Sequence, residues 1–114
     1  MTKNIKDQIF RIYCATSADI MNAGHDVVPS TFVAERVGCS RYMARKLIHE
    51  LVADGLLENA REGGYDDWNC KIYCINGFRI TEKARKTDVY KKEKWELCKL
   101  MAECFGGTAS SYYL

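Results

Sequence analysis

The sequence predicts a single α+β domain in which a three-helix core lies beside a small antiparallel sheet and is followed by a long C-terminal helix. Apolar residues recur at helical spacing over 3–21, 41–53 and 89–105. Two shorter segments, which are expected to pair as strands, lie between the glycines at positions 55, 63, 64 and 77. The chain has 114 residues, 47% of them hydrophobic, which suits one compact domain with a modest core.

The first helix is expected over residues 3–21. Its buried stripe consists of Ile5, Ile9, Ile12 and Tyr13, with Ile20 near the end. The segment Asn22-Ala23-Gly24 ends this helix, because glycine readily adopts the left-handed conformation of a helix C-terminus. Pro29 keeps residues 26–28 extended, and Ser30 is expected to cap the second helix.

Residues 33–57 predict a helix, a tight turn, another helix and the start of a strand. The turn is Gly38-Cys39-Ser40, and the following helix covers about 41–53. Its apolar stripe consists of Ala44, Leu47, Ile48, Leu51 and Val52, and the opposite side carries Arg41, Tyr42, Arg45, Lys46 and His49. From residue 36 to 49 there are four Arg or Lys side chains and no carboxylate. Such a helix is typical of an element that reads a DNA groove.

Two strands are expected at 56–61 and 70–75, joined by a flexible tip at 62–68. Asn76-Gly77 is also a strong hairpin signal, which predicts that residues 78–81 pair as an extra strand. Which strand pair forms the wing stays open, and we favour the pair joined by the longer loop. Thr81 is expected to cap the last helix. Gly106-Gly107 ends that helix, and residues 106–114 are predicted to form a flexible tail.

The pattern over residues 26–86 resembles winged helix-turn-helix DNA-binding domains. The matching positions are Val33, Ala34, Val37 and Cys39 in the first helix and turn, Ser40 at the start of the next helix, Gly55-Leu56-Leu57 at the first strand, and residues 78–83 leading into the last helix. Small MarR-like and PadR-like bacterial or phage transcriptional regulators are the most similar kinds. The resemblance implies a DNA-binding unit at residues 1–86, with residues 41–53 as a recognition helix in the major groove.

We therefore expect sequence-dependent binding of double-stranded DNA. Arg41, Tyr42 and Arg45 should reach base edges or nearby phosphates, because the N-terminal end of a recognition helix lies deepest in the groove. Lys46 and His49 should lie nearer the phosphate backbone, to which Ser40 could offer its hydroxyl group.

The expected wing, residues 56–76, departs from the usual cationic pattern. Its cations are Arg61 and Lys71, the only plausible wing contacts to DNA, against the four carboxylates Glu58, Glu62, Asp66 and Asp67. Carboxylates are repelled by phosphates, so this wing either stands off the duplex or binds a protein partner. A second basic group at residues 79–94 is most simply a solvated helix face.

The C-terminal helix, residues 87–105, has an apolar stripe longer than a small three-helix core needs. A homodimer could form through Tyr90, Leu97, Met101, Cys104 and Phe105. Packing of this stripe on the first helix is the alternative. A dimer would place two recognition helices about 34 Å apart on a pseudo-palindromic site.

Other functions remain open at this point. A winged helix can serve only as a protein-interaction module, or as a phage or mobile-element accessory factor in replication or excision. A thiol- or metal-responsive regulator is a third alternative.

Catalysis, a cofactor and a metal site are not expected. The sequence has two histidines and no glycine-rich phosphate loop or nucleophile elbow. Its six cysteines lack the close spacing of a structural zinc site, and we expect reduced thiols that mostly lie in the core. No apolar run is long enough to cross a membrane and no signal peptide precedes the first helix, so a cytoplasmic protein is expected.

Overall fold

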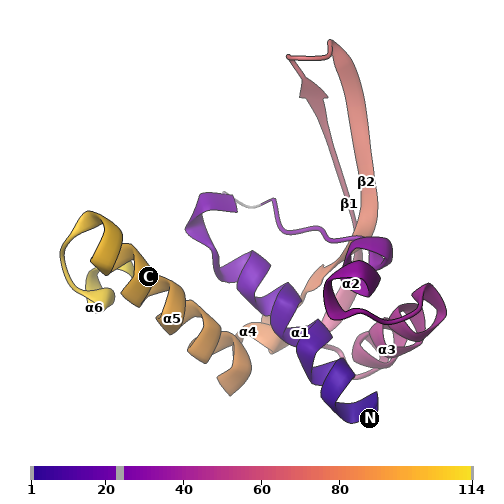
Figure 1. Ribbon diagram of the computed structural model, residues 1–114, viewed down its shortest axis with the longest axis horizontal. Helices are drawn as coiled ribbons and strands as arrows, with labels where there is room; N and C mark the ends of the chain where they lie inside the picture. The colour runs from indigo at the N-terminus through magenta and orange to yellow at the C-terminus, as the bar shows by residue number, and fades with distance from the viewer. Residues whose placement is uncertain (1, 23–24, 114) are drawn as a thin grey trace.

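Six α-helices and one two-stranded antiparallel sheet make up the part of the chain that the structure describes (Figure 1). The structure is a computed structural model and describes residues 2–22 and 25–113. The elements, in chain order, are α1 (Thr2–Ala18), the 3-10 helix η1 (Ile20–Asn22), α2 (Ser30–Val37), α3 (Arg41–Ala53), β1 (Leu57–Asp66), β2 (Lys71–Ile80), α4 (Glu82–Arg85), α5 (Asp88–Phe105) and α6 (Ala109–Tyr112). The predicted α+β class is confirmed.

The core lies where α1, α2 and α3 meet the base of the sheet. Its most deeply buried side chains are Tyr13, Ile9, Ile48, Leu57, Ile80, Val33 and Cys14. The Tyr13 hydroxyl donates a hydrogen bond of 2.8 Å to the Val28 carbonyl, so this buried polar group has a partner. The predicted apolar stripe of α3 is confirmed, since Ala44, Leu47, Ile48 and Leu51 are buried and Val52 is half-buried.

The first helix is shorter than predicted. It ends at Ala18, and Ile20 lies in η1 with 54% of its surface exposed, so its place in the buried stripe was wrong. Ile9 and Tyr13 are buried as expected, whereas Ile5 and Ile12 are only half-buried. The predicted glycine cap at Gly24 lies outside the described residues.

The two helix starts that follow have different caps. Ser30 does not cap α2: it is the first helical residue, and the cap position belongs to Pro29, which has no acceptor side chain. The turn into α3 was predicted correctly. Gly38 has a left-handed φ of 74° and its N–H bonds to the Ala34 carbonyl, while the Ser40 hydroxyl accepts a hydrogen bond from the Met43 N–H.

The two strands form a longer hairpin than predicted. β1 and β2 pair antiparallel from Leu57↔Ile80 to Asp66↔Lys71, so the end loop is only residues 67–70. Asn76-Gly77 is not a turn, because Gly77 lies within β2 opposite Ala60. Residues 78–80 therefore continue β2 and are no separate strand.

A third segment explains the glycine at position 77. Val28 pairs with Phe78 through two backbone hydrogen bonds of 2.9 and 3.1 Å, which brings its backbone against the sheet. A Cβ atom on Gly77 would lie 2.6 Å from the Val28 carbonyl oxygen. The position requires glycine for this close approach of two backbones.

The C-terminal region contains a helix break that the sequence analysis missed. Thr81 caps α4 as predicted, but that helix ends at Arg85 and Thr87 caps α5 anew through the Tyr90 N–H. α5 packs along α1, where Arg11 and Glu93 form an ion pair of 3.0 Å. Gly106 ends α5 as expected.

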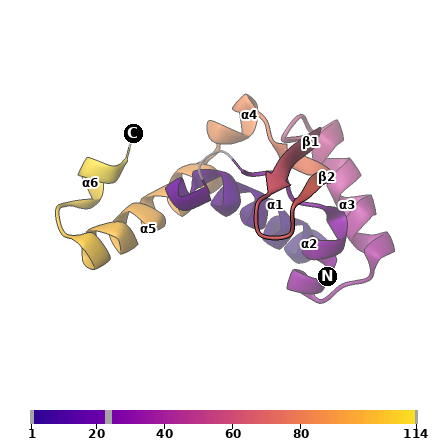
Figure 2. The same ribbon diagram turned by 90° about the horizontal axis from the view of Figure 1, so that it is seen from above.

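Residues 106–113, predicted as a flexible tail, contain the helical turn α6, which lies against α5 (Figure 1). The rings of Trp95 and Tyr113 meet edge to face with centroids 5.9 Å apart. The Tyr112 hydroxyl donates a hydrogen bond of 2.7 Å to the Gly106 carbonyl. Seen from above, α5 and α6 extend to one side and α3 lies at the other (Figure 2).

All six cysteines are free thiols, but only two of them are buried. Cys14 and Cys98 lie in the interior, and burial raises the pKa of the Cys14 thiol to about 12. Cys70, Cys74 and Cys104 are exposed, so the expectation that most of these thiols lie in the core was wrong. No helix in residues 2–22 and 25–113 is long and apolar enough to span a bilayer.

Candidate nucleic-acid interface

One side of α3 is an exposed cationic surface. Arg41, Arg45 and Lys46 are exposed, as are Tyr42, with 76% of its surface accessible, and His49. These positions are three or four residues apart, so they share one side of the helix over about 12 Å. The predicted recognition residues therefore do lie together. Ser40 sits at the start of this surface as the helix cap.

The carboxylates of Glu50 and Asp54, near the C-terminal end of α3, share one lysine from α1. The Lys6 ammonium lies 3.4 Å from a Glu50 carboxylate oxygen and 3.1 Å from an Asp54 oxygen. The hydrogen bond to Asp54 is the main cause of a raised pKa at Lys6. One lysine thus offsets part of the negative charge of these two carboxylates.

Four other cations outside α3 have acidic partners on neighbouring elements or turns. Arg11 pairs with Glu93, Arg79 with Glu58, Arg85 with Glu82 and Lys99 with Glu96. Within the residues described, no ion pair involves Arg41, Arg45 or Lys46. Exposed ion pairs add little stability, but each reduces the local positive potential. The three cations of α3 therefore keep their positive charge free of any carboxylate ion pair in the part of the chain that the structure describes.

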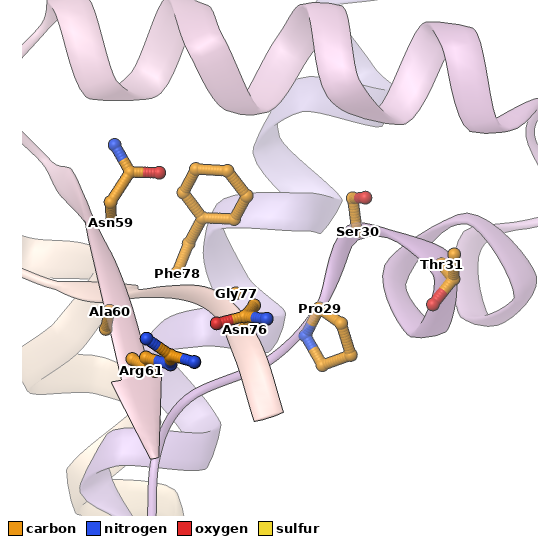
Figure 3. A pocket seen from close by; sticks show the side chains of 9 residues that line it. All are labelled: Pro29, Ser30, Thr31, Asn59, Ala60, Arg61, Asn76, Gly77 and Phe78. Carbon is orange, nitrogen blue, oxygen red and sulfur yellow. The ribbon is translucent and has the colours of Figure 1, made fainter. Parts of the chain in front are cut away.

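A groove of about 610 Å³ lies between the N-terminus of α2 and the base of the hairpin (Figure 3). Ser30 and Thr31 are on one side of it, and Asn59, Asn76 and Arg61 are on the other. Because Pro29 provides no side-chain cap, the first N–H groups of α2 have no acceptor from that position. The groove thus combines hydroxyls, amides, a guanidinium group and a helix N-terminus, which together suit an anion.

The groove adjoins the cationic surface of α3. The His49 ring meets the ring of Phe78, which lines the groove, edge to face with centroids 6.1 Å apart. Sequence reasoning placed Arg61 as a DNA contact but missed Ser30, Thr31, Asn59 and Asn76. No local pattern marks them, because their proximity depends on the strand register and on the Val28 bridge.

The strand register sorts the charges of the hairpin onto two faces. Residues directly opposite each other share a face, and successive residues alternate. One face, here the neutral face, carries Asn59, Arg61, Tyr65, Ile72, Cys74, Asn76 and Phe78. The other, the acidic face, carries Glu58, Glu62, Asp66, Lys71, Tyr73 and Arg79. The groove beside α2 contains side chains of the neutral face, which has no carboxylate.

The two predicted wing contacts are therefore separated. Arg61 is on the neutral face at the groove, and its Nε donates a hydrogen bond of 3.1 Å to the Cys74 sulfur. Lys71 is at the far end of the hairpin, on the acidic face opposite Asp66. Only Arg61 lies beside the helices that carry the other candidate residues.

Most hairpin carboxylates have partners within the chain. Glu58 pairs with Arg79 at 3.2 Å, and Glu62 lies 3.1 Å from the Nδ1 atom of His25. Asp66 holds the end turn, accepting hydrogen bonds from the Trp68 N–H and from the backbone and side chain of Asn69. These bonds, chiefly that from the Asn69 side chain, keep the pKa of Asp66 below its ordinary value. The predicted acidic wing is thus acidic on one face only.

The predicted dimerisation residues fall into three groups. Tyr90 packs against the core of its own chain. Leu97 and Met101 line a smaller cavity of about 140 Å³ together with Ile20, Met21 and Leu100. Cys104 and Phe105 are exposed at the end of α5.

In the described ranges, no three His, Cys, Asp or Glu side chains are grouped as a metal site would require. Comparison with known proteins gives no further guide: no protein-family model, no curated protein and no solved structure matches this chain.

Proposed function

We propose that this chain is a winged helix-turn-helix protein that binds double-stranded DNA with sequence preference, as a small transcriptional regulator. In this proposal α2 and α3 form the helix-turn-helix, α3 is the recognition helix, and the β1–β2 hairpin is the wing. The observation that carries the proposal is the exposed side of α3, where Arg41, Arg45 and Lys46 have no acidic partner among the described residues.

The side chains of α3 fit distinct parts of a duplex. Arg41 and Arg45 can each direct two parallel N–H groups at guanine O6 and N7 in the major groove. Lys46 suits a phosphate, as a single point charge. The Ser40 oxygen accepts a hydrogen bond from the Met43 N–H. The Ser40 hydroxyl can still donate its own hydrogen to a phosphate oxygen.

The groove beside α2 supports contact with the backbone of the same duplex. Ser30, Thr31 and Arg61 meet there beside the helix N-terminus, so a phosphate would find both hydrogen-bond donors and a positive charge. The neutral face brings no carboxylate into this groove. The wing is thus compatible with DNA, despite its acidic composition.

The proposal is tested by measuring duplex binding as a function of salt, using fluorescence anisotropy with a pool of random duplexes. If about four phosphates are contacted, log K should fall against log[salt] with a slope of about −3 to −4 per chain. Sequencing of the bound fragments should then yield a preferred site. The absence of duplex binding at low salt would contradict the proposal and favour a protein-interaction module that uses the acidic face.

Two copies are expected to pair through the C-terminal half of α5. Leu97, Leu100, Met101 and Phe105 offer apolar surface there, and Met21 of η1 adds to it. Tyr90 is engaged in its own core and is not part of this surface. Burial of these side chains between two copies would stabilise a two-fold dimer suited to a pseudo-palindromic site.

Sedimentation at micromolar concentration is expected to show a dimer that Leu100→Glu converts to a monomer, because the variant would bury a charge in the interface. Lys91→Glu is the control, since residue 91 is nine positions earlier and lies on the opposite side of the helix. A wild-type monomer at these concentrations would contradict the pairing, and so would a dimer that Leu100→Glu leaves intact.

A further inference from the structure

The end of the hairpin is an exposed cluster of large apolar side chains. Trp68 is 94% exposed, Ile72 is 85% exposed and Tyr65 is 58% exposed. Tyr65 and Ile72 are directly opposite each other on the neutral face, and Trp68 lies in the turn that follows. None of the three belongs to the core of the described residues. Apolar groups gathered in this way typically mark a binding surface.

The cluster is carried by a turn whose backbone is fixed by hydrogen bonds and in which Cys70 adopts a left-handed φ of 54°. Three hydrogen bonds to Asp66 fix the turn, one of them from the Trp68 N–H at 3.0 Å. The Tyr73 ring covers Gly64, where a Cβ atom would lie 2.6 Å from the ring's hydroxyl oxygen. Two paired strands of ten residues place the turn about 30 Å from the base of the hairpin. The backbone that carries Trp68 is therefore ordered before a partner binds, which lowers the entropy cost of binding.

The charges around the cluster indicate which molecule it meets. The neutral face runs without a carboxylate from Phe78, beside α3, through Arg61 to Tyr65 and Ile72. Asp66 is on the other face and directs its oxygens at the N–H groups of the turn. Asp67 is the remaining carboxylate of the turn. Tyr65 and Ile72 therefore continue the carboxylate-free face that begins beside α3, while Asp66 and Asp67 lie next to the cluster in the chain, with Asp66 engaged by the turn.

We propose that Trp68, with Ile72 and Tyr65, contacts the bases of the same duplex that receives α3, and acts as an apolar wedge at a base step. This inference rests on the proposed function. Every base has an aromatic face, so stacking by Trp68 needs no particular base. Apolar wedges between base steps partly unstack them and bend the duplex.

The wedge would add a second source of sequence preference. Pyrimidine–purine steps unstack more easily than other steps, so the deformation costs less where such a step lies at the wedge. The preferred site should therefore contain a flexible pyrimidine–purine step at a fixed distance from the bases read by α3. No side chain needs to form hydrogen bonds with the bases of that step.

The first test uses the fluorescence of Trp68 itself. The chain has two tryptophans, so Trp95→Phe leaves Trp68 as the only one and keeps an aromatic ring opposite Tyr113. Addition of a bound duplex from the selected pool should quench Trp68 and protect it from acrylamide. Full duplex binding with Trp68 still accessible to acrylamide would overturn the wedge and leave the α3 interface standing.

The second test compares variants at the two faces. Trp68→Ala is expected to raise Kd by roughly 5- to 100-fold and to reduce DNA bending measured by energy transfer, whereas Trp68→Phe should retain most of both. Tyr73→Ala, on the acidic face, is the control for any loosening of the hairpin end. If Trp68→Ala weakens binding no more than Tyr73→Ala, the wedge is overturned. If the wild-type protein binds no duplex, the wedge and the proposed function both fail.

Discussion

Replacement of Arg45 by alanine is expected to weaken binding of the preferred duplex by roughly 5- to 100-fold and to relax the preference at one base pair. A good paired contact between an arginine and a guanine contributes about 1–3 kcal/mol of discrimination. Arg45 is one helical turn after Arg41 on the exposed side of α3. No carboxylate among the described residues pairs with it, so it can bind DNA without first breaking an ion pair.

Lys46→Ala should behave differently, although it removes the same charge from the same surface. A phosphate contact carries no sequence information, so all duplexes should be weakened by a similar factor. The slope of log K against log[salt] should become shallower by about 1. Competition between the preferred duplex and a scrambled one, measured at several salt concentrations, separates the two kinds of effect.

Arg11→Ala is the matched control for these variants. It also exchanges an exposed arginine for alanine, but Arg11 pairs with Glu93 of α5, away from the exposed side of α3. Its removal should change duplex affinity only slightly. If Arg45→Ala and Arg11→Ala bind the preferred duplex equally well, α3 does not form the DNA-binding surface.

The turn at residues 38–40 and helix α3 could be predicted nearly residue by residue because their determinants are local. Gly38 supplies the left-handed residue, Ser40 caps the next helix within three residues, and the apolar stripe of α3 repeats every three or four positions. Each of these signals depends on neighbours within one or two helical turns. The exposed basic side of α3 follows from the same periodicity, so the main part of the candidate site was also predictable.

The hairpin could not be predicted in the same way. Asn76-Gly77 has the sequence of a tight turn, yet Gly77 lies in a strand because the Val28 backbone passes against it from 49 positions earlier in the chain. The division into a neutral and an acidic face depends on this register. Composition alone therefore gave an acidic wing, whereas the pairing directs most carboxylates to one side.

In the C-terminal part, the start of α5 could have been predicted from the sequence, whereas the position of α6 depends on tertiary contacts. Thr87 followed by Asp88 is a helix start, with a cap residue and an acidic first turn, and it could have been recognised in the sequence. The placement of α6 depends on Tyr113 meeting Trp95, a contact between side chains far apart in the sequence. Likewise, the pairing of Lys6 with Asp54 depends on how α1 packs beside α3.

Gly77→Ala is expected to lower the free energy of unfolding by about 1–3 kcal/mol, the usual cost of adding an atom to a well-packed site. The new Cβ atom would lie 2.6 Å from the Val28 carbonyl oxygen and 2.9 Å from the Pro29 nitrogen, so it meets backbone that cannot simply rotate away. The Val28–Phe78 bridge would have to open. Denaturation in urea, followed by circular dichroism, measures the loss.

Gly63→Ala is the matched control, because it makes the same change in the same hairpin. There the Cβ atom would meet only the Tyr73 carbonyl oxygen, at 3.4 Å, and the stability should change by less than about 1 kcal/mol. Equal stability of the two variants would contradict the close approach at Gly77. Because Pro29 leads directly into α2, an opened bridge would also shift Ser30 and Thr31 away from Arg61. The Gly77 variant should therefore bind duplex DNA more weakly than the Gly63 variant even under conditions where both are folded.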